Sequence, residues 1–120
     1  MLDKKDLEQA AKKWMEAWNN KDIESIMSHY SDEIILYSPA VVTRWGNQDC
    51  KLMGKSNLEL HFRKGLIEMP NMHFEFHAIL YGAGKIILLY KRETGNFAAD
   101  VVKFDKSGKV IEVNAFYESK

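Results

Sequence analysis

The sequence predicts an α+β fold in which three helices pack on a curved antiparallel sheet. Apolar residues recur at helical spacing in three segments of the first 70 residues. Residues 72–117 instead contain four runs typical of strands, with turn residues between them. Helices followed by a series of strands are typical of the α+β class. Because 120 residues lie within the usual size of one domain, we expect a single domain over residues 1–120.

The first helix is predicted over residues 3–20, and Asp22 can cap a shorter second helix. Gly54 precedes the third helix, which Pro70 ends. The apolar stripes of the three helices are, in order, Leu7, Ala11, Trp14 and Trp18; Ile23, Ile26, Met27 and Tyr30; and Leu58, Phe62, Leu66 and Met69.

Five strands are predicted, at residues 34–38, 72–81, 85–92, 97–105 and 109–117. Pro39 is expected to close the first strand. Short turns join the last four strands, so we expect an antiparallel meander. Residues 40–53 show no clear period, and residues 46–51 are typical of a loop.

Composition excludes several classes of protein. Seventeen basic residues balance seventeen acidic ones, so nothing favours nucleic acid or an anionic membrane as a partner. The longest purely apolar run, Ile86 to Tyr90, is too short to span a bilayer, and no apolar signal segment opens the chain. The single cysteine, Cys50, fits a reducing compartment, and we expect a cytoplasmic protein.

Asp100 is the most informative residue, because it lies inside an apolar strand. Both faces of this strand are apolar near Asp100, so its carboxyl group is shielded whichever face is inside. A buried carboxylate finds a partner or takes up a proton. One interpretation is a neutral acid that donates a hydrogen bond to a ligand. The other is a structural carboxylate satisfied by a backbone N–H, a hydroxyl or a cation.

Metals and cofactors are not expected. His73, Glu75 and His77 share one face of a predicted strand, but all three could not easily converge on a metal, and we interpret them as an outward polar face. His29 and His61 are expected on solvated helix surfaces. The chain has no glycine-rich nucleotide-binding motif.

The order and spacing of several short motifs resemble the nuclear transport factor 2-like superfamily, and within it the SnoaL-like and ketosteroid isomerase-like proteins. The motifs are Trp14-x-x-x-Trp18, Asp22-x-x-Ser25-Ile26-x-x-x-Tyr30, Ser38-Pro39, Gly54 before a helix, and Phe104-Asp105-Lys106-Ser107-Gly108-Lys109-Val110. The resemblance implies a strongly bent, cone-shaped sheet with a deep apolar pocket. It also implies a homodimer paired through the outer face of the sheet.

The resemblance also places three functional positions of ketosteroid isomerase on this chain. Its base corresponds to Ser38, its tyrosine to Trp14 and its protonated aspartic acid to Asp100. Ser38 cannot serve as that base and Trp14 is not equivalent to the tyrosine, so a true steroid isomerase is not expected.

Two functional hypotheses follow. In the first, the pocket binds a small apolar ligand with a carbonyl or hydroxyl group, and Asp100 is the acid of an isomerase, cyclase or dehydratase. In the second, the domain is a non-catalytic dimeric interaction module, with the same side chains filling a core. The residues expected to contact a ligand are Trp14, Trp18, Tyr30, Ser38, Phe62, Tyr90, Val102 and Tyr117.

Overall fold

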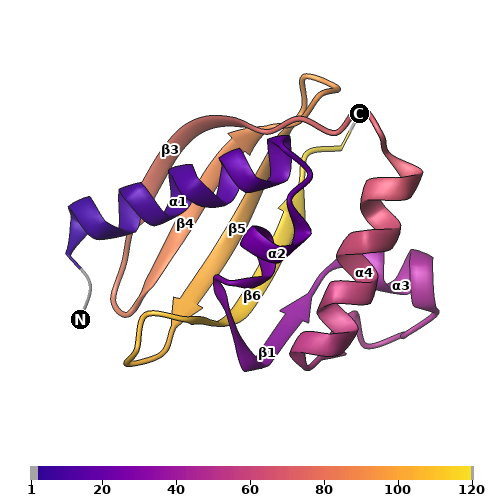
Figure 1. The fold of residues 1–120 in the computed structure, drawn as a ribbon, viewed down its shortest axis with the longest axis horizontal. Coiled ribbons are helices and arrows are strands. Elements are labelled where there is room, and N and C mark those ends of the chain that lie inside the picture. The colour runs from indigo at the N-terminus through magenta and orange to yellow at the C-terminus, as the bar shows by residue number, and fades with distance from the viewer. Residues whose placement is uncertain (1–2, 120) are drawn as a thin grey trace.

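The computed structural model describes residues 3–119 and has the predicted α+β architecture. Four helices pack on a curved, open sheet of six strands (Figure 1). The helices are α1 (Lys4–Asn19), α2 (Ile23–Met27), α3 (Pro39–Trp45) and α4 (Lys55–Glu68). The strands are β1 (Tyr30–Tyr37), β2 (Lys51–Met53), β3 (Glu75–Tyr81), β4 (Lys85–Lys91), β5 (Phe97–Phe104) and β6 (Val110–Tyr117).

The sheet has the strand order β2-β1-β6-β5-β4-β3. Strands β3 to β6 form the predicted meander, with every neighbouring pair antiparallel. The sheet is mixed, however, because β1 pairs in parallel with β6. The prediction of a purely antiparallel sheet is therefore wrong at this one pair, whose strands are separated by most of the chain.

The structure has one helix and one strand that were not predicted, α3 and β2, and both lie in or next to the region that the sequence pattern left unassigned. Pro39 does not simply close a strand, because it is the first residue of α3, where its missing N–H is harmless. Ser38 is the N-cap of α3, and its Oγ accepts a hydrogen bond of 3.1 Å from the backbone N–H of Ala40. β2 has only three residues and pairs with the end of β1.

Two strand boundaries also differ from the prediction. β1 begins at Tyr30, so Tyr30 belongs to a strand and not to the second helix. β3 begins at Glu75, which leaves His73 outside the strand. A register shift between Phe76 and Ala78 also interrupts the regular alternation of β3.

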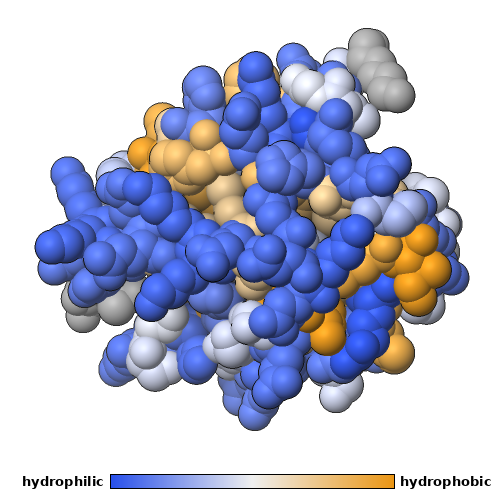
Figure 2. Space-filling view, turned by 45° about the horizontal axis from the view of Figure 1, so that its top comes forward, coloured by the Kyte–Doolittle hydropathy of each residue, from blue (hydrophilic) through white to orange (hydrophobic). Residues whose placement is uncertain are grey.

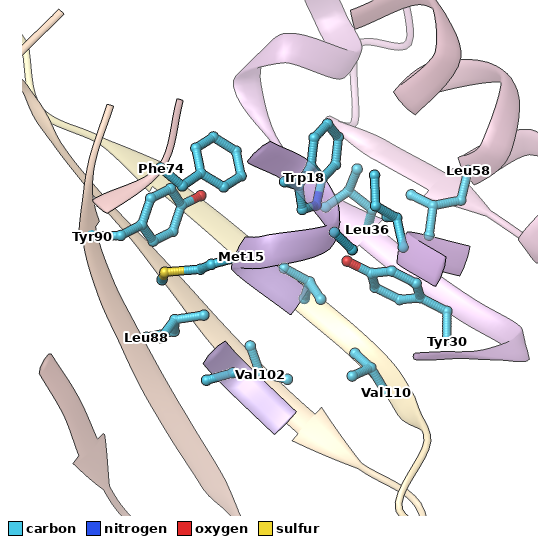
Figure 3. Packing of buried hydrophobic residues seen from close by; sticks show 14 of the residues in the cluster. Met15, Trp18, Tyr30, Leu36, Leu58, Phe74, Leu88, Tyr90, Val102 and Val110 are labelled. Atoms are coloured by element: carbon cyan, nitrogen blue, oxygen red, sulfur yellow. The ribbon is translucent and has the colours of Figure 1, made fainter. Parts of the chain in front are cut away.

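The helices cover one face of the curved sheet. α1 crosses the strands of the meander, while α3 and α4 lie at the β1 end (Figure 1). The core lies between these helices and the sheet, where aromatic side chains from α1, the segment before β3, and β4 pack together (Figure 3). Among residues 3–119, no helix has the length and hydropathy needed to cross a membrane.

Candidate functional site

A cavity of about 280 Å³ lies between the helices and the inner face of the sheet. Side chains therefore do not fill the space between helices and sheet completely, although several aromatic rings line the cavity. The cavity is lined by Trp14, Trp18, Tyr30, Ile34, Leu36, Ser38, Ala40, Arg44, Leu58, His61, Phe62, Gly65, Met69, Met72, Phe74, Tyr90, Arg92, Asp100, Val113, Ala115 and Tyr117.

The structure brings Asp100 and seven of the eight predicted contact residues to this cavity. Val102 is the exception, because it lines a separate, narrow cavity of about 40 Å³ under the N-terminal half of α1. Asp100 and Tyr30 line both cavities. The two cavities therefore lie on either side of the same group of side chains.

Asp100 is held on the inner face of the sheet by the alternation of β5. Ala98, Asp100 and Val102 are buried, and their neighbours along the strand are more exposed. Leu88 of β4 and Ala115 of β6 stand opposite Asp100, so apolar side chains flank it on both sides. The carboxyl group has little access to solvent and no cation beside it in a salt bridge within residues 3–119.

One hydrogen bond reaches the Asp100 carboxyl group within the described residues. The Tyr90 hydroxyl donates to Oδ2 over 3.3 Å, which is long for a hydrogen bond between two oxygen atoms. Burial raises the pKa of Asp100 to about 7, although the Tyr90 hydroxyl and the positive charge of Arg92 lower it in part. Asp100 is therefore a mixture of acid and carboxylate near neutral pH.

The tyrosines around Asp100 remain protonated. Burial raises the pKa of Tyr90 well above its usual range, and the negative charge of Asp100 adds to that rise. Burial likewise raises the pKa of Tyr30. The Tyr30 hydroxyl accepts a 2.8 Å hydrogen bond from Trp14 Nε1, so its own proton is left to be donated elsewhere.

Two predicted contact residues have structural partners of their own. The Trp14 indole N–H is used by Tyr30, and its ring stacks on Phe74 at 5.5 Å between centroids. Ser38 is buried, caps α3 and lies 3.4 Å from the Tyr117 hydroxyl. Tyr117 itself is 45% exposed and stands at the edge of the cavity, with its hydroxyl turned toward Ser38.

His61 forms part of the opposite wall, and its predicted position on a solvated surface is wrong. It is 5% exposed and lies on the face of α4 that packs inward. Trp45 Nε1 lies 3.0 Å from His61 Nδ1, and Arg44 Nη1 lies 3.0 Å from Nδ1 and 3.4 Å from Nε2. Because the indole N–H of Trp45 can only donate, Nδ1 is the acceptor and the neutral ring carries its proton on Nε2. Burial, followed by the charge of Arg44, lowers the pKa of His61 to about 4.

Two arginines of the cavity wall were not identified from the sequence. Arg44 pairs with Glu68 at 2.9 Å, and Arg92 pairs with Glu93 at 3.1 Å. Arg92 could have been identified, because Ile86, Leu88 and Tyr90 alternate inward along β4 and residue 92 continues that face. No comparable pattern marked Arg44, whose helix was itself not predicted.

The residues considered for metal binding do not form a site. His73 and His77 are exposed, and His77 packs edge-on against Phe97. No group of three histidine, cysteine, aspartate or glutamate side chains suitable for a metal ion occurs in residues 3–119. Cys50 is partly buried and lies at the end of the loop between α3 and β2.

Comparison with known protein families identifies the family of this chain. The SnoaL-like domain family matches residues 11–118, which is nearly the whole chain. The chain belongs to the SnoaL-like domain family. The resemblance predicted from the order of the sequence motifs is thereby confirmed.

Solved SnoaL-like structures have the same fold. A SnoaL-like protein of unknown function from Burkholderia thailandensis is 28% identical, with a TM-score of 0.91 and coverage of 99% of this chain and 100% of that one. An isomerase candidate of the SnoaL-like family from Agrobacterium tumefaciens is 14% identical, with a TM-score of 0.72 over 92% and 96% of the two chains.

A candidate SnoaL-like polyketide cyclase from Shewanella denitrificans is 12% identical, with a TM-score of 0.71 over 92% and 89% of the two chains. At such identities these last two structures establish the shared fold alone. The comparison with proteins of curated function finds no match.

Proposed function

We propose that this SnoaL-like protein binds a small, mostly apolar molecule through a carbonyl or hydroxyl group, and that Asp100 acts on that group as acid or hydrogen-bond donor. The observation that carries the proposal is the state of Asp100. Its carboxyl group is buried at the wall of an open cavity and has one long hydrogen bond where a structural carboxylate would have several.

The chemistry that fits this group is proton transfer next to a carbonyl. A neutral Asp100 donates a hydrogen bond to the carbonyl oxygen and stabilises the negative charge that develops there as a solvent water molecule accepts the neighbouring C–H proton. With a pKa of about 7, the same residue is also present as a carboxylate that can accept a proton. Isomerisation, cyclisation and dehydration of carbonyl compounds all begin with such an enolisation.

The family supports this class of reaction without defining a substrate. Among structures of the same fold are the isomerase and polyketide cyclase candidates described above. The steroid isomerase reaction itself is not proposed, because Ser38 caps α3 where that enzyme has its base. Tyr30 and Tyr90 are the hydroxyl groups that would position the substrate beside Asp100.

The proposed biological unit is a homodimer formed through the outer face of the sheet. Leu80, Ile87 and Phe116 are 51%, 37% and 58% exposed, and Leu80 pairs with Ile87 across β3 and β4. Elsewhere, the face shown in Figure 2 is largely hydrophilic, with apolar residues in small separate areas. Light scattering after size-exclusion chromatography tests this: the mass of a dimer is expected, and the mass of a monomer excludes it.

Hydrogen–deuterium exchange of a simple ketone tests the catalytic proposal. Wild-type protein and Asp100→Asn are incubated with 2-tetralone in D2O, and loss of the α-proton signals is followed by NMR. We expect exchange catalysed by the wild type and about 100-fold slower exchange with Asp100→Asn. Asp32→Asn, at an exposed position of β1, is the matched control and should keep the wild-type rate.

Binding is measured separately, from chemical-shift changes of the cavity residues. If 2-tetralone binds and Asp100→Asn keeps the full exchange rate, Asp100 is not the acid. If no carbonyl or hydroxyl compound of a cyclic-ketone and cyclic-alcohol set perturbs the cavity signals, ligand binding is excluded as well.

A further inference from the structure

The charged side chains of the cavity are unevenly distributed. Arg44 and Arg92 both stand beside the last turn of α4, where Arg44 lies against Gly65 and pairs with Glu68, and Arg92 contacts Met69. The negative end of a helix dipole favours cations at this position. Asp100 is the acidic residue of the wall, on β5.

Arg92 is held in place by contacts on three sides. Its guanidinium group lies 5.4 Å from the centre of the Phe74 ring, and its Nε and Nη2 donate to the two carboxylate oxygens of Glu93. Nη2 also lies 3.5 Å from the Met69 sulfur. The side chain is 16% exposed. Nη1 donates no hydrogen bond to any residue from 3 to 119, so a fixed guanidinium group keeps two N–H groups for another acceptor.

Arg44 adds a second positive charge whose hydrogen bonds are mostly used. Its Nη1 is shared with His61, and its Nε and Nη2 donate to one oxygen of Glu68. Neither arginine can lose its charge at ordinary pH. Burial raises the pKa of the Tyr117 hydroxyl, and the charges of Arg92 and Arg44 both act to lower it, so both charges reach the edge of the cavity.

We propose that the ligand of this cavity carries a carboxylate group, and that Arg92 binds this group through Nη1 with Arg44 adding a second positive charge. The proposal rests on the proposed function of the same cavity and defines its substrate class as small, apolar keto or hydroxy carboxylic acids. A rigidly held guanidinium group is well suited to a planar carboxylate, because little side-chain entropy is lost on binding.

Arg92 and Asp100 favour different chemical groups of a ligand in the cavity. Arg92 attracts an anion, and a protonated Asp100 on β5 tolerates one nearby while offering a hydrogen bond to a carbonyl or hydroxyl oxygen. A ligand with both groups would be oriented in one direction. An uncharged ligand would use the Asp100 part alone and leave the N–H groups of Arg92 without an acceptor.

The test compares 2-naphthoate with 2-naphthamide, which has nearly the same shape and no charge. Both are titrated into wild-type protein by calorimetry at pH 6, where Asp100 is largely protonated. A charged hydrogen bond predicts that naphthoate binds about tenfold tighter or more. In Arg92→Gln this preference should fall to about threefold or less. Arg63→Gln, which removes an exposed arginine paired with Glu59, is the matched control and should keep the preference.

Each outcome decides the proposal. If naphthamide binds as tightly as naphthoate to the wild type, the cavity accepts small molecules but has no carboxylate site. If the preference persists in Arg92→Gln, Arg92 does not provide it. If neither compound binds, the proposed ligand-binding function fails together with this inference. The comparison of the two compounds on wild-type protein requires no variant, so the result does not depend on the folding of Arg92→Gln.

Discussion

Asp100 and His61 are two buried titratable side chains on different walls of the same cavity, and both are shifted toward their neutral forms. His61 reaches that state with its Nδ1 accepting from Trp45 and Arg44 at 3.0 Å each. Asp100 reaches it with one 3.3 Å hydrogen bond from Tyr90. The comparison teaches that burial alone does not define a site. The hydrogen-bond acceptor of His61 is already used by Trp45 and Arg44, whereas the Asp100 carboxyl group can still form hydrogen bonds with a ligand.

The two residues also have opposite effects on stability as pH changes. The pKa of Asp100 is raised to about 7, so its protonated form favours the fold at low pH, and this contribution is lost as pH rises from about 4 to about 7. The pKa of His61 is lowered to about 4, so the fold loses stability as pH falls from about 6.5 to about 4. The two windows overlap but have opposite slopes.

Replacement of Asp100 by asparagine is expected to give the largest effect. Asparagine cannot ionise, so it removes the loss of stability that the wild type undergoes as pH rises from about 4 to about 7. From the shift of the pKa from 3.8 to about 7, the gain is at most roughly 4 kcal/mol at pH 8 and close to none at pH 4. Urea unfolding at both pH values measures it. Asp32→Asn is the control, and a gain that is equal at pH 4 and pH 8 would contradict a raised pKa.

Replacement of His61 by alanine should be the next largest effect, in the opposite direction. It removes the acceptor of Trp45 Nε1 and the ring acceptor of Arg44 Nη1, which keeps only its 3.3 Å hydrogen bond to the backbone carbonyl of residue 61, and it leaves a gap where the buried ring stood. A loss of about 2–3 kcal/mol at pH 7 is expected from urea unfolding. His73→Ala, at an exposed histidine, should change stability by less than about 0.5 kcal/mol. Equal stability of wild type and His61→Ala would show that His61 is not held by these bonds.

Replacement of Tyr90 by phenylalanine should have the smallest effect on stability and a specific effect on Asp100. The variant loses one long hydrogen bond, so the expected loss is about 1 kcal/mol or less. Since the Tyr90 hydroxyl lowers the pKa of Asp100, that pKa should rise further in the variant. NMR titration of the carboxyl group measures it. A lowered pKa would mean that Tyr90 does not donate to the carboxylate.

Much of the fold could be predicted because its signals are local. Apolar residues on both faces of β5 were enough to predict that Asp100 is shielded, and the helical stripes located α1 and α4. The pairing of β1 with β6 could not be predicted, because nothing in either segment specifies a parallel partner so distant in the chain. Ser38-Pro39 is an N-cap followed by a proline at the first helical position, which could have predicted α3.

Only the local features of the candidate site could be predicted from the sequence. His61 follows Leu58 by three residues and precedes Gly65 by four, so it lies on the buried stripe of α4. That spacing could have shown that it is buried. The partners of His61 could not be predicted, because they come from the end of α3, whose position depends on tertiary packing. The cavity itself also follows from packing, since the same aromatic residues could have filled it.

Measurement of the pKa of the Asp100 carboxyl group is the most direct test of the claim that Asp100, unlike His61, is not satisfied by its hydrogen-bond partners. Carbon-detected NMR of labelled protein gives the titration curve, and Asp100→Asn identifies the signal. A pKa of about 7 is expected, because burial outweighs the single hydrogen bond from Tyr90 and the charge of Arg92. A pKa at or below that of a free aspartate, about 3.9, would show a satisfied structural carboxylate and contradict the assignment of Asp100 as the acid.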